Sequence, residues 1–167
     1  MNQMFRALIE TALHPVLVTV DNDGLTGLIL LDVEQASKYR RINKLQPKPS
    51  QMELINLQDT IDWIENYFSN QPAKLPTLAL KGLNEFTQKV LLELCNTNRG
   101  QTITYGELAL KSGNPKASRA IGSAMAENPL TLVIPCHRVV PSDGGVGNYS
   151  GHGGTITKQW LLDHESA

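Results

Sequence analysis

The turn sequence Asp21-Asn22-Asp23-Gly24 is the feature that most constrains how this chain folds. Asp-Gly and Asn-Gly pairs favour the tight turns that join neighbouring antiparallel strands. Here the turn separates two runs that are rich in branched apolar residues, 16–20 and 25–31. Such runs on both sides of a tight turn are typical of paired strands. The sequence therefore predicts a β-hairpin near the N-terminus.

A helix and a linker are predicted after the hairpin. Apolar residues recur at intervals of three and four over residues 54–68, which predicts one buried helix face. The members of this face are Leu54, Leu57, Ile61, Ile64 and Phe68. Pro72 and Pro76 then interrupt the chain and predict a linker. We expect an α/β fold with an N-terminal α/β domain over residues 1–82, built from a small β-sheet and a helix, and a second domain over residues 83–167.

The second domain is predicted to be mainly helical. Apolar spacing predicts a helix over residues 84–96. Thr104 and Glu107 have the spacing of a capping box, so a second, short helix should begin there and end near Gly113.

A third helix is predicted to begin at Asn114-Pro115 and to end near Ala126, because Asn is a good N-cap and Pro suits the first helical position. Two short helices joined by a tight turn that contains Gly are typical of a helix-turn-helix. A last helix is predicted over residues 156–165.

The charge of the chain limits the kind of partner it can bind. Its 167 residues include 15 Lys and Arg against 16 Asp and Glu, for a net charge of −1. This balance disfavours a long basic groove along nucleic acid. Residues 105–138 carry four basic side chains against two acidic ones, which permits a small contact. No apolar run long enough to span a membrane and no secretory signal is present, so we expect a soluble intracellular protein, cytoplasmic or, in a eukaryote, nuclear.

The two cysteines, Cys95 and Cys136, are expected to be free thiols in such a protein. Cys95 lies on the apolar face of the predicted helix 84–96 and is expected to be buried and inert. The four histidines are scattered, and no Cys and His cluster has the spacing of metal ligands. We therefore expect no metal site.

The sequence Pro135-Cys136-His137 indicates a reactive thiol. A thiol attacks as the thiolate, and a neighbouring His can remove its proton. A carboxylate on the far side of the imidazole would orient the ring, and Glu165 and Asp163 are the candidates. The pattern taken alone leaves open a buried structural Cys that lies beside a His by chance.

A longer set of motifs around Cys136 resembles one known family, the O6-alkylguanine-DNA alkyltransferases (methylated-DNA–protein-cysteine methyltransferases). The resemblance runs from about Phe86 to the end of the chain. Its motifs are Thr104–Ala109, Asn114–Gly122, Met125, Asn128-Pro129, Ile134–Val140, Gly144, Gly147–Gly151, Lys158–Leu162 and Glu165. It implies DNA repair by a single, irreversible transfer of an alkyl group from O6-alkylguanine, with O4-alkylthymine as a further candidate, to the protein's own Cys136.

The resemblance also implies a role for each matched residue. Cys136 would accept the alkyl group, and His137 would act as its base through a water. Glu165 would hold His137, and Asn128 would be a hinge between the DNA-binding helices and the Cys segment. Tyr105 would rotate a phosphate and help to protonate the departing guanine. The implied substrate pocket contains Met125, Val139, Tyr149, Ser150 and Lys158.

The implied partner is double-stranded DNA that carries the damaged base. The third helix would enter the minor groove, Arg119 would take the place of the flipped guanine in the base stack, and the protein would act as a monomer without a cofactor. The residues implied in DNA contact are Thr87, Tyr105, Asn114, Ser118, Arg119, Ala120 and Gly122. Chemistry on a base requires that the base leave the helix stack, and small residues on the third helix allow close approach to a groove.

Three departures from the family pattern are visible. Leu92 stands where a Trp is common on the first helix of the second domain, which should affect only packing. The Gly-rich loop 150–157 is about two residues longer than expected, and the chain lacks the N-terminal Cys with which some members bind a structural zinc. Two alternative functions stay open. The first is a helix-turn-helix protein that senses alkylated DNA or regulates transcription without repair; alkyltransferase-like proteins of that kind lack the acceptor Cys, which is present here. A Cys-His hydrolase would need an oxyanion loop, and none is evident.

Overall fold

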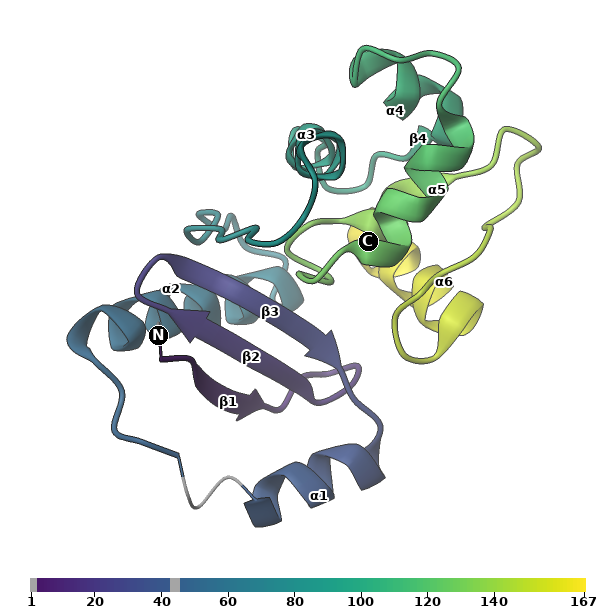
Figure 1. Cartoon of the computed structure of the whole chain (residues 1–167). Coiled ribbons are helices and arrows are strands. Elements are labelled where there is room, and N and C mark those ends of the chain that lie inside the picture. Colours follow the sequence, from purple (N-terminus) through teal and green to yellow (C-terminus); the bar gives the residue numbers. More distant parts are fainter. Residues whose placement is uncertain (1–2, 43–45) are drawn as a thin grey trace. The chain divides into compact units, whose positions relative to one another are not determined.

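The computed structural model describes residues 3–42 and 46–167. The chain divides into two compact units, Met1–Lys81 and Gly82–Ala167, and each is described by itself. Figure 1 shows both units and labels their helices and strands where there is room.

The first unit contains the predicted hairpin. Strands β1 (Phe5–Ile9), β2 (Val16–Asp21) and β3 (Gly24–Leu30) form an antiparallel sheet in the order β1-β2-β3 (Figure 1). Asp21 pairs with Gly24, so Asn22 and Asp23 form a two-residue turn. Asp21 Oδ1 accepts hydrogen bonds from the backbone N–H groups of Asp23 (2.8 Å) and Gly24 (3.2 Å). The hairpin prediction is confirmed, whereas β1 was not predicted.

Helix α2 (Gln51–Phe68) packs on this sheet with a face that differs from the predicted one. Of the predicted apolar residues only Ile64 is buried, and Leu54 is 43% exposed. The buried residues are Glu53, Asn56, Thr60, Trp63, Ile64 and Tyr67. Three of them are polar, and hydrogen bonds explain their burial. Glu53 closes a capping box with Ser50, Asn56 Nδ2 donates to Asp21 O (2.8 Å), and Thr60 Oγ1 donates to Asn56 O (2.8 Å).

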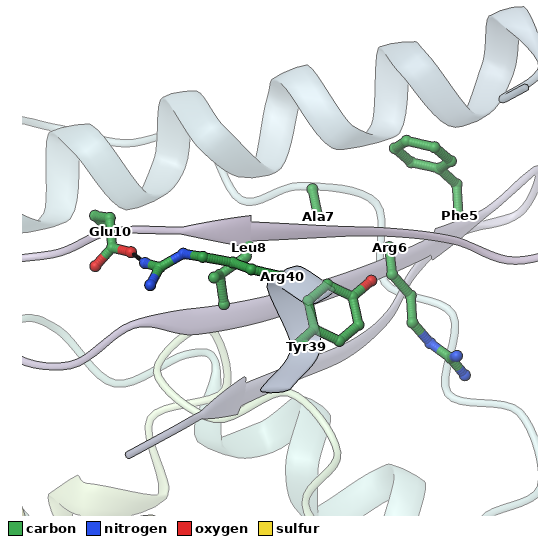
Figure 2. Close-up of a pocket in the computed structure, with 7 residues that line it drawn as sticks. All are labelled: Phe5, Arg6, Ala7, Leu8, Glu10, Tyr39 and Arg40. Carbon is green, nitrogen blue, oxygen red and sulfur yellow. Dashed lines mark ion pairs between the residues drawn. The ribbon is translucent and has the colours of Figure 1, made fainter. Parts of the chain in front are cut away.

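Helix α1 (Val33–Ile42) and β1 border a cavity of about 630 Å³ in the first unit (Figure 2). The residues that line it are Phe5, Arg6, Ala7, Leu8, Glu10, Tyr39 and Arg40, and Figure 2 shows Arg40 paired with Glu10. Beside it, the side-chain amide of Gln46 accepts from Arg6 N (2.8 Å) and donates to Arg6 O (2.8 Å), which occupies part of the free edge of β1. All of these residues belong to the first unit, whereas Cys136 belongs to the second.

The second unit is mainly helical, as predicted. Helices α3 (Glu85–Leu94), α4 (Tyr105–Lys111) and α5 (Ser118–Glu127) pack against one another. Strand β4 (Ile103–Thr104) pairs in parallel with β5 (Val139–Val140). The short 3-10 turn η2 (Cys136–Arg138) leads directly into β5 and packs against the last helix, α6 (Gly154–Ser166).

The capping box at α4 is confirmed, but the predicted start of the third helix is wrong. Thr104 accepts from Glu107 N (3.1 Å), and Glu107 Oε2 accepts from Thr104 N (2.8 Å). Helix α5 begins only at Ser118, and no side chain caps it. The reason is a turn at Asn114–Ala117, where Asn114 O accepts from Ala117 N (3.0 Å). Pro is favoured at the second position of such a turn, so Pro115 ends up before the helix instead of within it.

Within residues 3–42 and 46–167, no helix is both long and apolar enough to cross a membrane.

Candidate active site around Cys136

Cys136 lies at the start of η2, in a buried segment that Asn128 holds in place. The residue is 6% exposed. Asn128 follows the last residue of α5, its Nδ2 donates to Ile134 O (3.0 Å), and its Oδ1 accepts from Leu130 N (3.0 Å). One amide side chain therefore bridges the turn that connects α5 to the Cys segment. The hinge role expected for Asn128 concerns this same connection.

Several groups surround the thiol. Burial raises the pKa of Cys136 above its ordinary value, while a hydrogen bond from the Asn128 side chain, the ammonium of Lys158 and nearby backbone N–H groups oppose the rise. Burial also raises the pKa of Tyr105, and the nearby Cys136 adds to the shift. The resting sulfur is thus a protonated thiol, in a setting that already contains donors for the thiolate.

The structure places Glu165, and not Asp163, against His137. His137 Nε2 and Glu165 Oε1 are 2.6 Å apart, and the two side chains are 0% and 1% exposed. Asp163 is exposed and accepts a hydrogen bond from Gln159 Nε2 (2.8 Å). Both carboxylates come from α6, but only Glu165 lies on its buried face.

The protonation states of this pair define which imidazole nitrogen can act as a base. Burial alone would raise the pKa of the Glu165 carboxyl, but hydrogen bonds from His137 and Arg138 hold it well below its usual range. An ionised carboxylate can only accept, so Nε2 of His137 carries the proton. Burial lowers the pKa of His137, which keeps the ring neutral at rest. The lone pair is then on Nδ1, which is buried and bonds to no side chain or backbone group among the described residues.

Arg138 is a member of this site that the sequence analysis missed. Its Nε and Nη2 donate to the two oxygens of Glu165, at 2.8 Å and 3.1 Å. The residue is 8% exposed. The prediction that Arg138 is among the cations available to DNA is wrong, because the guanidinium is buried against a carboxylate. The local positive excess over residues 105–138 is smaller than expected.

Lys158 is a fully buried cation beside the thiol. Its Nζ donates to Val139 O (2.6 Å) and to Asn148 O (3.0 Å), so it ties the loop before α6 to β5. Burial lowers the pKa of Lys158, and the neighbouring Cys136 opposes the change. Gly147 lies close by with φ +76, and a Cβ there would be 2.8 Å from the Pro141 ring. A larger residue at this position would be strained and would push against the loop.

The other residues predicted for the pocket lie near the end of α5, in β5 and in the loop before α6. Met125 and Val139 are buried, and Ser150 Oγ is 3.5 Å from Met125 O, at the limit of a hydrogen bond. The Tyr149 ring covers Gly151 so closely that a Cβ there would be 2.4 Å from it. The Gly-rich loop is shorter than predicted, because Gly153 caps α6 and Gly154 is its first residue.

The residues predicted to contact DNA divide into an exposed group and one buried exception. Asn114, Ser118, Arg119 and Ala120 are exposed, Gly122 and Tyr105 are partly exposed, and all lie at or near α4 and α5. The side chain of Thr87 does not fit the prediction. It is 3% exposed and lies 3.4 Å from Glu127 Oε2, so it is turned into the protein.

Cys95 contrasts with Cys136. It is half-buried at the end of α3, and its Sγ donates to Leu91 O (3.4 Å). Burial raises the pKa of Cys95 to about 11, and the charge of Arg138 only partly opposes this. A thiol with so high a pKa is almost wholly protonated at neutral pH and is a poor nucleophile.

Comparison with known proteins identifies relatives of this chain. Residues 85–167 match the family described as "6-O-methylguanine DNA methyltransferase, DNA binding domain". A methylated-DNA–protein-cysteine methyltransferase of Methanosarcina mazei is 36% identical over 166 residues, which cover 97% of each protein. The mouse protein of the same name is 48% identical over 111 residues, 62% of this chain and 52% of the mouse protein. The match to this chain thus spans about half the length of the mouse protein.

Solved structures show the same fold. The crystal structure of the Mycobacterium tuberculosis O6-methylguanine methyltransferase has a TM-score of 0.77 at 28% identity, over 98% of this chain and 93% of that one. A crystal structure of the M. tuberculosis protein OGT in complex with DNA has a TM-score of 0.75 at 31% identity, over 95% and 91% of the two chains. The α/β fold with its small sheet and helical second unit is therefore confirmed.

Proposed function

This chain belongs to the methylated-DNA–protein-cysteine methyltransferase family, and we propose that it repairs DNA by moving an alkyl group from O6 of guanine to its own Cys136. The observation that carries the proposal is the buried His137–Glu165 pair at 2.6 Å, directly after a buried thiol. A neutral imidazole with its free nitrogen and a fixed carboxylate partner is what a thiol needs to lose its proton.

The proposed chemistry moves one alkyl group and one proton. Nδ1 of His137 takes the thiol proton through a water, while Glu165 stabilises the imidazolium that forms. The Cys136 sulfur then attacks the alkyl carbon, an S–C bond forms, and the C–O6 bond breaks with its electron pair left on guanine. We assign Tyr105, whose pKa the thiol influences, as the proton donor to the departing base, and its phenolate then regains a proton from the His137 imidazolium through water. We assign the stabilisation of the thiolate to Asn128 and Lys158, since both lower the pKa of Cys136 against the effect of burial.

The product is a thioether, which explains why the reaction should occur once. A thioether has no good leaving group, and the second thiol, Cys95, is half-buried with its pKa raised to about 11. Nothing in the described site can therefore regenerate Cys136. The protein is expected to be consumed in proportion to the damage that it repairs, without a cofactor.

The proposed substrate is a damaged base that has left the DNA helix. A thiol that is 6% exposed cannot reach an O6 substituent inside a duplex, so the base must be extruded at a cost of a few kcal/mol. Residues Asn114, Ser118, Arg119 and Ala120 form the exposed face that would enter the minor groove. We assign α4, the turn after it and α5 to a helix-turn-helix, and Arg119 to the gap left by the flipped base. The protein would act as a monomer on double-stranded DNA, and the alkyl-transfer domain would be the second unit.

A titration with duplex DNA that contains O6-methylguanine tests this proposal. Methyl transfer should saturate at one equivalent per protein, and Cys136→Ser should transfer nothing. Cys95→Ser is the matched control and should behave like the wild type. Transfer beyond one equivalent, or full transfer by Cys136→Ser, would contradict the proposed mechanism.

A further inference from the structure

We infer that Arg138 is a positioning residue of the active site, which fixes the Glu165 carboxylate so that Oε1 faces His137. This role rests on the proposed function and deepens it. The carboxylate accepts hydrogen bonds at both of its oxygens. His137 Nε2 (2.6 Å) and Arg138 Nη2 (3.1 Å) meet Oε1, and Arg138 Nε (2.8 Å) and Gly100 N (3.3 Å) meet Oε2.

The fork of Arg138 defines the orientation of the carboxylate. The terminal torsion of Glu is broad, so a carboxylate with a single partner can turn. A guanidinium that donates to both oxygens fixes the carboxylate plane, and this paired geometry is particular to Arg. Glu165 Oε1 is then presented to His137, and the imidazole ring is fixed in turn.

Arg138 is itself held from its other side. Its Nη1 donates to Thr97 O (2.6 Å) and to Thr97 Oγ1 (3.1 Å), just after α3. The guanidinium therefore uses both of its ends, one on the chain after α3 and one on α6. The single ammonium nitrogen of a Lys cannot reproduce this arrangement, since it lacks the planar fork.

The segment 97–100 is shaped to complete the same contact. Gly100 adopts φ +77, and a Cβ there would be 3.1 Å from Glu165 O. A side chain at this position would be both strained and crowded, so Gly allows the close approach that brings its N–H to Glu165 Oε2. Arg99 Nη2 donates to His164 O (2.9 Å) and fastens the same segment to α6 through the backbone of that helix.

The charged groups around the His137 imidazole allow the positioning role of Arg138 to be measured through the protonation of that ring. Glu165 favours the imidazolium, whereas Arg138 and Lys158 oppose it. The Arg138→Lys variant keeps a positive charge nearby but loses the fork, so Glu165 should turn and the two His137 tautomers should mix. A purely structural contribution would lower stability and leave the tautomer and the pH–rate profile of the folded protein unchanged.

The test compares Arg138→Lys with Arg99→Lys. The second variant is the matched control, because Arg99 also links the segment 97–100 to α6. Nitrogen NMR of His137 should show one tautomer, protonated at Nε2, in the wild type and in Arg99→Lys, and a mixture in Arg138→Lys. The alkylation rate of Arg138→Lys should fall by about tenfold to a hundredfold, because small misplacements of catalytic groups have effects of this size. Its pH–rate profile should also shift.

Two results would overturn the inference. One is an unchanged His137 tautomer in folded Arg138→Lys, and the other is a rate loss equal to that of Arg99→Lys with no shift of the pH–rate profile. The NMR measurement needs no alkylated DNA, so it separates this inference from the proposed function. A wild type that transfers no alkyl group, but holds His137 in one tautomer, would contradict the function and leave the positioning role standing.

Discussion

Replacing Glu165 by Gln removes one buried negative charge and leaves the size of the side chain almost unchanged. In the native site the carboxylate lies 2.6 Å from His137 Nε2, and both side chains are almost completely buried. The amide still offers one acceptor, but it no longer stabilises a positive imidazole. It also leaves the Arg138 guanidinium without the anion that its Nε and Nη2 contact.

The size of the effect follows from the geometry. A carboxylate and an imidazolium whose charge centres are about 4.5 Å apart interact by about 4 kcal/mol at an effective dielectric constant of about 20. If about half of the proton transfer has occurred in the transition state, about 2 kcal/mol of stabilisation is lost. This corresponds to a rate about thirtyfold lower. The apparent pKa of the Cys136 thiol should rise, because the base that accepts its proton is weaker.

The assay is the single-turnover rate of alkyl transfer at saturating DNA, measured from about pH 5 to about pH 9. DNA affinity, measured by fluorescence anisotropy, should stay near that of the wild type, since Glu165 is buried. Asp163→Asn is the matched control, because it removes the exposed carboxylate of the same helix and should change neither property. If Glu165→Gln has the same pH–rate profile as the wild type, Glu165 does not take part in the reaction.

Three further predictions concern other parts of the protein. Arg119→Ala should slow the repair of duplex DNA far more than the reaction with free O6-alkylguanine, and equal losses would show that Arg119 does not act in base extrusion. Gly151→Ala should slow transfer from O6-benzylguanine more than from O6-methylguanine, because its added methyl group displaces the Tyr149 ring; an unchanged ratio would place that ring outside the pocket. The pKa of Glu165 is lowered in the folded state, so the ionised carboxylate stabilises the fold above its unfolded pKa of about 4.3, and this stabilisation is lost as the pH falls further. Acid unfolding, followed by circular dichroism, should therefore be less steep for Glu165→Gln than for the wild type. Equal steepness would refute the linkage.

Local hydrogen-bond patterns are the part of the fold that the sequence predicts well. The hairpin turn at Asp21–Gly24 and the capping box of Thr104 and Glu107 each depend on neighbouring residues, and both form as expected. The buried face of α2 was mispredicted for a physical reason. Asn56 and Thr60 can be buried because their polar groups bond to Asp21 O and Asn56 O, and periodicity of apolar residues does not register such bonds.

The candidate site shows the same division. The Cys136–His137 neighbourhood is local, but the choice between Glu165 and Asp163 depends on which face of α6 is buried. The spacing of residues within α6 could have identified the buried face, because Lys158, Leu161 and Glu165 follow one another at intervals of three and four. The role of Arg138 had no such signal, since its partners are Thr97 and Glu165, 41 and 27 residues away.

Intact-mass spectrometry after mixing with O6-methylguanine DNA tests the central claim most directly. We expect every active molecule to gain the mass of one methyl group in place of one hydrogen, and peptide mapping to place it on Cys136. A protein that binds the DNA but gains no mass would be a sensor of damage, and a gain on Cys95 would put the acceptor at the wrong thiol. Either result would contradict the account.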